Sequence, residues 1–316
     1  MKIKNKVNVL LIGYGYWGPN LARNIDNSND YNLISICDSS KKQFSQIKKI
    51  YPKVKILEDY KKAIMQTGVN LVVIATPTKT HYEIAKYALQ NDKHILVEKP
   101  ITQSSKELRS LYKIADKKKK EIFVDYPFLF SGASEYLKKI ISSNTYGKPY
   151  LLEFIREQAP IREDCNVLWD LGIHDISILN YFFDKDLTID NKIKNYNFVK
   201  KNYDSINLFL HIDNNINIQI KSAWMSPTKI RIIKVRFKDV TIICNENEPI
   251  HKIEIYKKIL KNHWSYKKDL PDVDLREPLG KLLNYVFLVI KNKKKNNLIN
   301  KKLNLKITKL LEKVDK

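Results

Sequence analysis

The sequence predicts an α/β protein: an amino-terminal doubly wound parallel sheet, then a second α/β domain with a mainly antiparallel open sheet. In the first part, short β-branched runs alternate with longer amphipathic runs, whereas consecutive alternating segments dominate the remainder. A glycine-rich turn also follows the first apolar run directly. We therefore expect one domain at residues 1–125 and a second at residues 126–316, with the boundary near Tyr126.

The first domain is expected to hold six strands joined by helical crossovers. Such crossovers join parallel strands, so this order predicts a doubly wound nucleotide-binding sheet. The expected strands are 7–12, 33–37, 54–56, 71–75, 94–97 and 122–124, and the expected helices are 17–26, 41–51, 60–67, 81–91 and 104–117.

The second domain changes rhythm, because most of its strand patterns follow one another with little helix between them. This order predicts an antiparallel sheet with helices on one face. The expected helices are 132–142, 174–183, 279–290 and 308–316, and the expected strands are 150–157, 206–212, 216–223, 230–237, 241–244 and 252–256.

Composition excludes several classes of protein. With 43% apolar and 10% aromatic residues, the chain has enough material for folded cores. Its 57 Lys and Arg against 34 Asp and Glu give a net charge of +23, yet only seven of these cations are Arg and the lysines are spread along the chain. We therefore expect solvated lysine faces and no nucleic-acid partner.

Localisation is expected to be cytoplasmic. No apolar stretch approaches the roughly 20 residues of a membrane helix, and residues 1–7 run straight into a strand pattern instead of a signal-peptide core. The three cysteines, Cys37, Cys165 and Cys244, are far apart and lack the spacing of a disulfide framework or metal site. We expect reduced thiols and neither a membrane partner nor a bound metal.

A GxGxxG motif follows the first strand and opens the first helix. In that setting Gly13 makes the tight turn, Gly15 lets the backbone approach a pyrophosphate, and Gly18 allows close helix packing. Tyr16 and Trp17 lie at the helix start, where free N–H groups face the phosphates. A turn without a ligand is the alternative interpretation.

Asp38 ends the second strand, 20 residues after Gly18. A carboxylate there accepts hydrogen bonds from a ribose 2′-hydroxyl and repels a 2′-phosphate, so NAD is favoured over NADP. The residues that follow it, Ser39 to Lys42, keep open the alternative of a 2′-phosphate contact.

Further polar residues follow the fourth and fifth strands, namely Thr76 with Pro77 and Glu98 with Lys99. Both groups lie at the sheet edge where doubly wound folds bind ligands. Later, Asp170 and His174 are four residues apart, which places them on one face of a helix. A lysine, a carboxylate and a histidine beside a nicotinamide form a proton-transfer set for oxidising an alcohol.

At these motifs the sequence resembles the Gfo/Idh/MocA family of oxidoreductases. The likeness covers essentially the whole chain, through GYGYWGPN, ATPTKTH, EKP, WDLGIHD and SAWMSPTKIR. It implies a Rossmann domain joined to an α/β domain whose open sheet helps to form the substrate site and a subunit interface, in a homodimer or homotetramer. It also implies NAD(P)-dependent oxidation or reduction at a sugar or cyclitol carbon.

The resemblance assigns roles to single positions. Lys99 matches the catalytic lysine, His174 the acid/base and Asp170 its neighbouring carboxylate. The Lys99–Pro100 bond is a candidate for the cis form. The residues on the nicotinamide side are Thr76, Pro77, His81, Glu98 and Lys99, and those expected to bind substrate are Arg156, Arg162, Asp170 and His174.

Within the family, the chain looks most like the branch acting on nucleotide sugars in surface-polysaccharide synthesis, such as UDP-N-acetylglucosaminuronate 3-dehydrogenases. The alternatives are an inositol or free-sugar dehydrogenase, a 3-ketosugar reductase, and a non-catalytic regulator that senses dinucleotide. Two departures from the family pattern are Tyr126, where His or Asn is usual, and the absence of glycine at residues 158–166.

Overall fold

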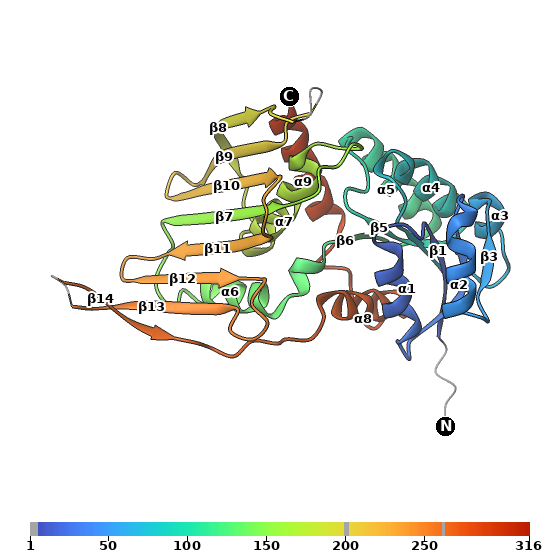
Figure 1. Ribbon diagram of the computed structural model, residues 1–316, viewed down its shortest axis with the longest axis horizontal. Helices are drawn as coiled ribbons and strands as arrows, with labels where there is room; N and C mark the ends of the chain where they lie inside the picture. The colour runs from blue at the N-terminus through green and yellow to red at the C-terminus, as the bar shows by residue number, and fades with distance from the viewer. Residues whose placement is uncertain (1–5, 199–201, 261–262) are drawn as a thin grey trace. The chain divides into compact units, whose positions relative to one another are not determined.

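The computed structural model describes residues 6–198, 202–260 and 263–316 (Figure 1). Most of the amino-terminal segment considered above for a signal peptide, residues 1–5, lies outside the described residues. The chain divides into two units, Met1–Pro127 with Leu279–Thr308, and Phe128–Pro278 with Lys309–Lys316.

The first unit contains the expected parallel sheet of six strands, in the order β3-β2-β1-β4-β5-β6. After β3 the chain returns to place β4 on the other side of β1, and this reversal of strand order creates the crevice where such folds bind ligands. The prediction of a doubly wound sheet is confirmed. Its strands are β1 (Val7–Ile12), β2 (Tyr31–Cys37), β3 (Lys55–Leu57), β4 (Leu71–Ile74), β5 (His94–Glu98) and β6 (Ile122–Asp125).

Helical crossovers join these strands and lie close to their predicted ranges. The helix expected from residue 81 begins at Thr78, directly after Pro77, which is its N-cap residue. The helix expected at 41–51 is divided into a short 3₁₀ turn and an α-helix. The elements are α1 (Gly18–Asp26), η1 (Lys41–Gln43), α2 (Phe44–Ile50), α3 (Tyr60–Ile64), α4 (Thr78–Gln90) and α5 (Ser105–Lys118).

Residues 279–308 return to the first unit, although the sequence analysis assigned them to the second domain. They include most of α8 (Pro278–Ile290) and the first half of α9 (Lys301–Asp315). The Tyr31 hydroxyl donates to the Leu283 carbonyl oxygen at 2.6 Å, and the Asn304 amide donates to the Tyr112 hydroxyl at 2.6 Å. These pairings join residues far apart in sequence, so local periodicity could not reveal them.

The second unit contains eight strands in the order β14-β13-β12-β11-β7-β10-β9-β8. β7 pairs in parallel with β10, and the other neighbours are antiparallel, as predicted. The strands are β7 (Leu151–Gln158), β8 (Thr188–Asn195), β9 (Ser205–Ile212), β10 (Ile216–Trp224), β11 (Ile230–Arg236), β12 (Val240–Asn245), β13 (Ile253–Leu260) and β14 (His263–Asp269).

The sequence analysis missed both edge strands, β8 and β14. Each is polar, TIDNKIKN and HWSYKKD, because charged side chains on an edge strand discourage pairing with other chains. Apolar alternation is therefore weak in them. α6 (Gly132–Ser142) and α7 (Ile173–Phe182) cover one face of the sheet (Figure 1). The 3₁₀ turn η2 (Pro127–Phe130) precedes α6, and the π-helical turn η3 (Leu168–Gly172) leads into α7.

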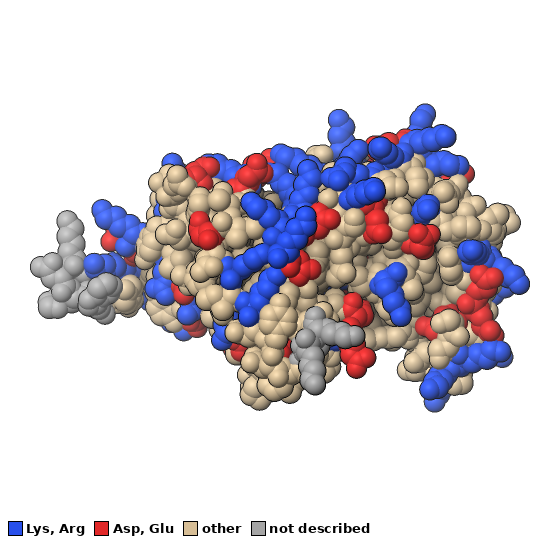
Figure 2. Space-filling view, turned by 90° about the horizontal axis from the view of Figure 1, so that it is seen from above, with Lys and Arg blue, Asp and Glu red and all other residues tan. Residues whose placement is uncertain are grey.

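No helix in the described ranges is both long and apolar enough to cross a membrane. Figure 2 shows Lys and Arg side chains spread over the visible face, with Asp and Glu among them. The large positive charge is thus interspersed with negative groups on this face.

Candidate functional site

The glycine loop is shaped by close backbone contacts within the first unit. Gly13 has φ +94°, and a Cβ there would lie 2.5 Å from the Ala75 carbonyl oxygen, so the position requires glycine. A Cβ on Gly18 would lie 2.4 Å from the Gly13 carbonyl oxygen. Gly15 has no atom within 4 Å of its ideal Cβ position, and the Tyr16 side chain is 91% exposed. The loop therefore packs against the end of β4 and leaves open backbone at Gly15.

Asp38 lies beside this loop at the end of β2. One carboxylate oxygen accepts from the Tyr14 backbone N–H at 2.7 Å, and the other accepts from the Ser40 N–H at 2.8 Å. Two backbone donors fix the carboxylate and leave it further lone pairs for ribose hydroxyls. The nearby Lys41 forms an exposed ion pair with Glu58 at 3.1 Å.

His81 joins the loops that follow β4 and β5. Its two ring nitrogens lie 2.8 Å from the Pro100 carbonyl oxygen and 2.7 Å from the Thr76 carbonyl oxygen, and the residue is 1% exposed. The structure thus brings the Thr76–Pro77 turn and the Lys99–Pro100 turn together through this buried ring. The Lys99–Pro100 peptide bond is cis, in agreement with the sequence analysis.

Two buried carboxyl groups lie beside Lys99, on neighbouring strand ends. Glu98 and Asp125 are direct partners in the register of β5 and β6, and the Trp17 indole donates to Asp125 Oδ2 at 3.1 Å. Burial, and then the negative charge of Asp125, raise the pKa of Glu98 well above its usual value. Burial also raises the pKa of Asp125. Because two adjacent buried carboxyls rarely both ionise, we infer that this pair keeps a proton at neutral pH.

This raised pKa predicts the behaviour of Glu98→Gln. A carboxyl whose pKa is raised by folding stabilises the folded protein below its unfolded pKa of 4.5, and that contribution is lost as pH rises toward the folded pKa. Glutamine mimics the protonated acid, so the variant should gain on the order of 1–3 kcal/mol of unfolding free energy at about pH 7. Urea unfolding of the ligand-free protein at several pH values measures this gain.

The gain should shrink toward zero as pH approaches about 4.5. The exposed substitution Glu83→Gln on α4 serves as the control, because it removes one carboxylate without touching the pair. If Glu98→Gln were less stable than the wild type at every pH, the buried pair would be ionised.

In the second unit, Asp170 lies in the π-helical turn and is 5% exposed. The Trp224 indole donates to Asp170 Oδ2 at 3.0 Å, and Arg162 donates to Oδ1 at 3.3 Å. Arg162 also forms two hydrogen bonds, at 2.9 and 2.8 Å, with Asp164. The carboxylate of Asp170 is therefore fixed from two sides. His174 follows in α7, so the two residues belong to different helical turns and not to one regular α-helix.

Asp315, near the end of α9, holds the π-helical turn. Its Oδ1 accepts from the Asn166 amide at 2.8 Å and from the Tyr203 hydroxyl at 2.7 Å, and its Oδ2 accepts from the Trp169 indole at 2.9 Å. Charge-assisted hydrogen bonds of this kind are strong. Asp315 thus orients the residue next to Asp170.

Arg156, expected to contact substrate, is 2% exposed and donates twice to Asp175 Oδ1, at 3.0 and 2.7 Å. Its guanidinium carbon lies 4.5 Å from the centroid of the Phe128 ring. That ring also packs edge-on against His174, with centroids 5.0 Å apart. In the structure Arg156 is thus buried and paired with Asp175 of α7, the residue that follows His174.

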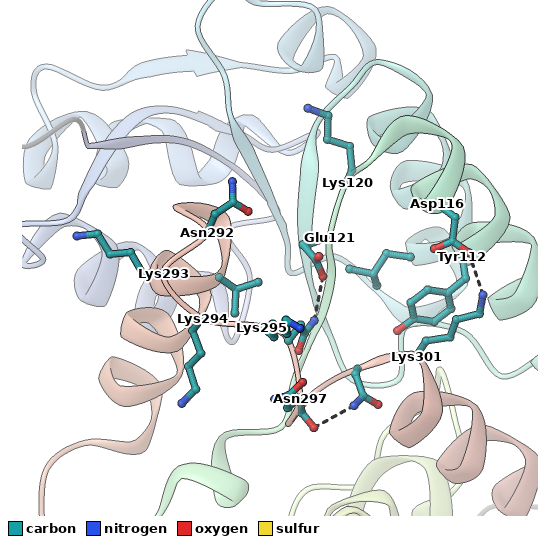
Figure 3. Close-up of a pocket in the computed structure, with 14 residues that line it drawn as sticks. Tyr112, Asp116, Lys120, Glu121, Asn292, Lys293, Lys294, Lys295, Asn297 and Lys301 are labelled. Atoms are coloured by element: carbon teal, nitrogen blue, oxygen red, sulfur yellow. Dashed lines mark hydrogen bonds and ion pairs between the residues drawn. The ribbon is translucent and has the colours of Figure 1, made fainter.

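A cavity of about 620 Å³ lies in the first unit beside Glu121 at the amino end of β6, the sheet edge opposite to the glycine loop. Figure 3 shows Lys120, Lys293 and Lys294 pointing in different directions, while Lys301 reaches Asp116 at 2.9 Å. These cations do not converge, so we do not place the functional site there.

Sequence reasoning missed Asp125, Phe128, Asp175 and Asp315. Asp125 carried a usable signal, because it ends a parallel strand at the edge where ligands bind. The others act through contacts between distant segments, which leave no local pattern. Cys37, Cys165 and Cys244 are buried, and none of them forms a disulfide. Within the described ranges, no group of three or more His, Cys, Asp or Glu side chains has the geometry of a metal site.

Comparison with known proteins agrees with this architecture. Residues 7–126 match the oxidoreductase family with an NAD-binding Rossmann fold, Gfo/Idh/MocA. An NAD-dependent scyllo-inositol 2-dehydrogenase of Bacillus subtilis is 30% identical over 197 residues, which are 59% of this chain and 56% of that protein. The NADP-dependent scyllo-inositol 2-dehydrogenase of the same organism is 27% identical over 201 residues, 58% of this chain and 54% of that protein. The matched region thus spans about half the length of these relatives.

Solved structures match over nearly the whole chain. UDP-N-acetylglucosamine 3-dehydrogenase from Acidithiobacillus ferrooxidans has a TM-score of 0.83 at 18% identity, covering 98% of this chain and 96% of that one. A 3-ketoreductase from Actinomadura kijaniata, in complex with TDP-benzene and NADP, has a TM-score of 0.88 at 14% identity, covering 98% and 97%. These likenesses establish the fold of both units. The family match covers the glycine loop, Asp38 and the EKP turn, so residues 7–126 are similar to the Gfo/Idh/MocA oxidoreductases.

Proposed function

We propose that the protein is an NAD(P)-dependent oxidoreductase that interconverts a ring hydroxyl and a ketone on a sugar, with a nucleotide sugar as the favoured substrate. The observation that carries the proposal lies in the first unit. There the open backbone of Gly15, the fixed Asp38 carboxylate and the Lys99 turn all follow parallel strands of one sheet. This is the edge at which such sheets bind dinucleotides.

The residues of this edge fit a dinucleotide. The loop from Gly13 to Gly18 would hold the pyrophosphate, Asp38 the adenosine ribose, and the Thr76, Pro77, Glu98 and Lys99 turns the nicotinamide side. NAD is favoured over NADP, because Asp38 faces the ribose position with both oxygens fixed by backbone donors. When bound, the nicotinamide supplies a hydride acceptor or donor at C4.

We assign the proton chemistry to Lys99 and His174. His174 takes the hydroxyl proton while the carbon loses its hydride, and Lys99 stabilises the negative charge that develops on the same oxygen. Asp170, held by Trp224 and Arg162, orients the substrate. In the reductive direction the same residues return the proton to the ketone oxygen.

The open face of the eight-stranded sheet is proposed as the subunit interface of a homodimer or homotetramer. It presents Ile155, Phe209 and Ile232, which are only partly buried within the single chain. Synthesis of a surface-polysaccharide sugar is the proposed role, supported by the motifs of the nucleotide-sugar branch. Inositol is a second candidate substrate, favoured by the names of the curated relatives.

The test is an assay of reduced-nicotinamide absorbance with NAD or NADP and a panel of substrates. The panel contains UDP-N-acetylhexosamines, their uronates, free sugars and inositols, with a coupled step that removes the ketone. Reduction of NAD by one UDP-sugar is the expected result, and reduction by inositol alone would support the second candidate. If the protein bound neither NADH nor NADPH, the whole proposal would be wrong.

A further inference from the structure

Two arginines lie side by side on the covered face of the second sheet. Arg156 on β7 and Arg231 on β11 are direct partners in the antiparallel register. Both guanidinium groups contact the Phe128 ring, with carbons 4.5 and 4.9 Å from its centroid. Like charges directly opposite each other in a sheet repel, so this pair needs compensating contacts or a bound anion.

Asp175 supplies the carboxylate that interacts with both arginines. It accepts both hydrogen bonds of Arg156 on a single oxygen, and the charge of Arg231 also lowers its pKa against the raising effect of burial. In the described part of the chain, Asp175 Oδ2 and Arg156 Nη1 are buried without a hydrogen-bond partner. Asp175 is therefore shared between two cations, and the cluster keeps unused hydrogen-bonding capacity.

A third cation lies two residues before Arg231. Lys229 is exposed, and its pKa is lowered by partial burial of its ammonium group and by the charges of Arg231 and Arg156. The side chain of Lys229 is thus close enough to both arginines to be affected by their charges. The neighbouring Glu246 is already engaged, because Ser131 donates to it at 2.7 Å and Lys252 lies 4.0 Å away.

This cluster is next to the proposed acid/base. The Phe128 ring that contacts both arginines also packs against His174, and Asp175 follows His174 in α7. An anion held at Lys229 and Arg231 would therefore lie near the Phe128 ring, which also contacts His174. The spacing suits a substrate whose anionic group is attached to the reacting sugar.

We propose that Lys229 and Arg231 bind an oxyanion of the substrate, a diphosphate or a sugar carboxylate, with Arg156 and Asp175 positioning Arg231 from beneath. This inference rests on the proposed function, because it assigns the substrate class of the same site. A diphosphate or a carboxylate accepts hydrogen bonds from a guanidinium in a bidentate manner and also attracts an ammonium group. The site gives a physical reason for the positive charge in the SAWMSPTKIR segment.

The experiment measures binding by calorimetry with the full chain and NADH, using UDP, UDP-N-acetylglucosamine, glucuronate and myo-inositol as separate probes. Lys229→Gln and Arg231→Gln should each weaken binding of the anionic probe by about 10- to 100-fold, as loss of a charged hydrogen bond does. Binding of NADH and of neutral myo-inositol should stay within about twofold, because the proposal places no anion of either ligand at Lys229 and Arg231. Lys238→Gln, at the opposite end of β11, is the matched control that removes one exposed cation.

The probes separate the two anions, because UDP reports a diphosphate site and glucuronate a carboxylate site. Lys229 is exposed, so its variant remains informative if Arg231→Gln unfolds, which a thermal melt would show. Unchanged affinity of Lys229→Gln for both anions, or equal weakening by Lys238→Gln, would overturn the inference. Because binding needs no turnover, its failure is distinguishable from failure of the proposed reaction, which the hydride-transfer assay tests.

Discussion

Lys99→Ala should lower kcat by a factor on the order of 10² to 10⁴, the usual cost of removing a positioned proton-transfer group. The expectation follows from where Lys99 is held. It lies between the buried Glu98–Asp125 pair and the turn fixed by His81. Burial raises the pKa of both carboxyls, and the charge of Lys99 opposes part of that rise. Initial rates of NAD reduction with the preferred sugar measure the effect, and fluorescence titration with NADH measures the retained cofactor affinity.

Lys106→Ala, an exposed substitution on α5, is the control for loss of a lysine in the same unit. Its kcat should match that of the wild type. Lys99→Arg keeps the charge but changes its shape, so it should recover only part of the rate. Near-normal turnover of Lys99→Ala with intact NADH binding would remove Lys99 from the mechanism.

Gly13→Ala should abolish dinucleotide binding and destabilise the first unit. At φ +94° an alanine is strained by roughly 1–3 kcal/mol, and its Cβ would also lie 2.5 Å from the Ala75 carbonyl oxygen, where neither backbone segment is free to shift. Relief of that clash would separate the glycine loop from the end of β4. Denaturant unfolding and NADH titration should therefore both report large losses.

Gly15→Ala is the matched control within the same loop. Its Cβ would meet no atom within 4 Å, so unfolding free energy should stay close to the wild-type value. NADH affinity should still fall, because the added methyl group would occupy the space through which a pyrophosphate approaches the backbone. Equal stability loss in both variants would contradict the packing argument for Gly13, and unchanged NADH affinity in both would contradict the cofactor site.

The parallel sheet could be predicted because β1, β2, β4, β5 and β6 are short, largely buried apolar runs, each encoded within one stretch of chain. The glycine loop and Asp38 were equally local, since their spacing alone indicated a dinucleotide site. The edge strands β8 and β14 were missed for the opposite reason, because their polar sequences resemble loops. The grouping of 279–308 with the first unit leaves no local signal, because α8 packs against a strand encoded some 250 residues earlier.

The same contrast between local sequence patterns and contacts of distant segments applies to the site residues. The sequence motifs nominate Lys99, Asp170 and His174 as site residues, but they do not reveal the tertiary contacts around them. Trp224, on a distant strand, donates a hydrogen bond to Asp170. Asp315, in the last helix, accepts a hydrogen bond from Trp169 in the same π-helical turn. Arg156 illustrates the limit, because the resemblance placed it among the substrate-binding residues and only tertiary structure shows its burial against Asp175.

The discontinuity of the first unit has a consequence for biosynthesis. The ribosome makes β1 to β6 first, yet Tyr31 and Tyr112 obtain their partners at Leu283 and Asn304 only after residues 128–278 of the second unit have been translated. Until then the nascent parallel sheet exposes the apolar surface that α8 later covers. A fragment ending at residue 127 would therefore be prone to aggregate. In the full chain, the sheet stays incomplete during most of the remaining translation.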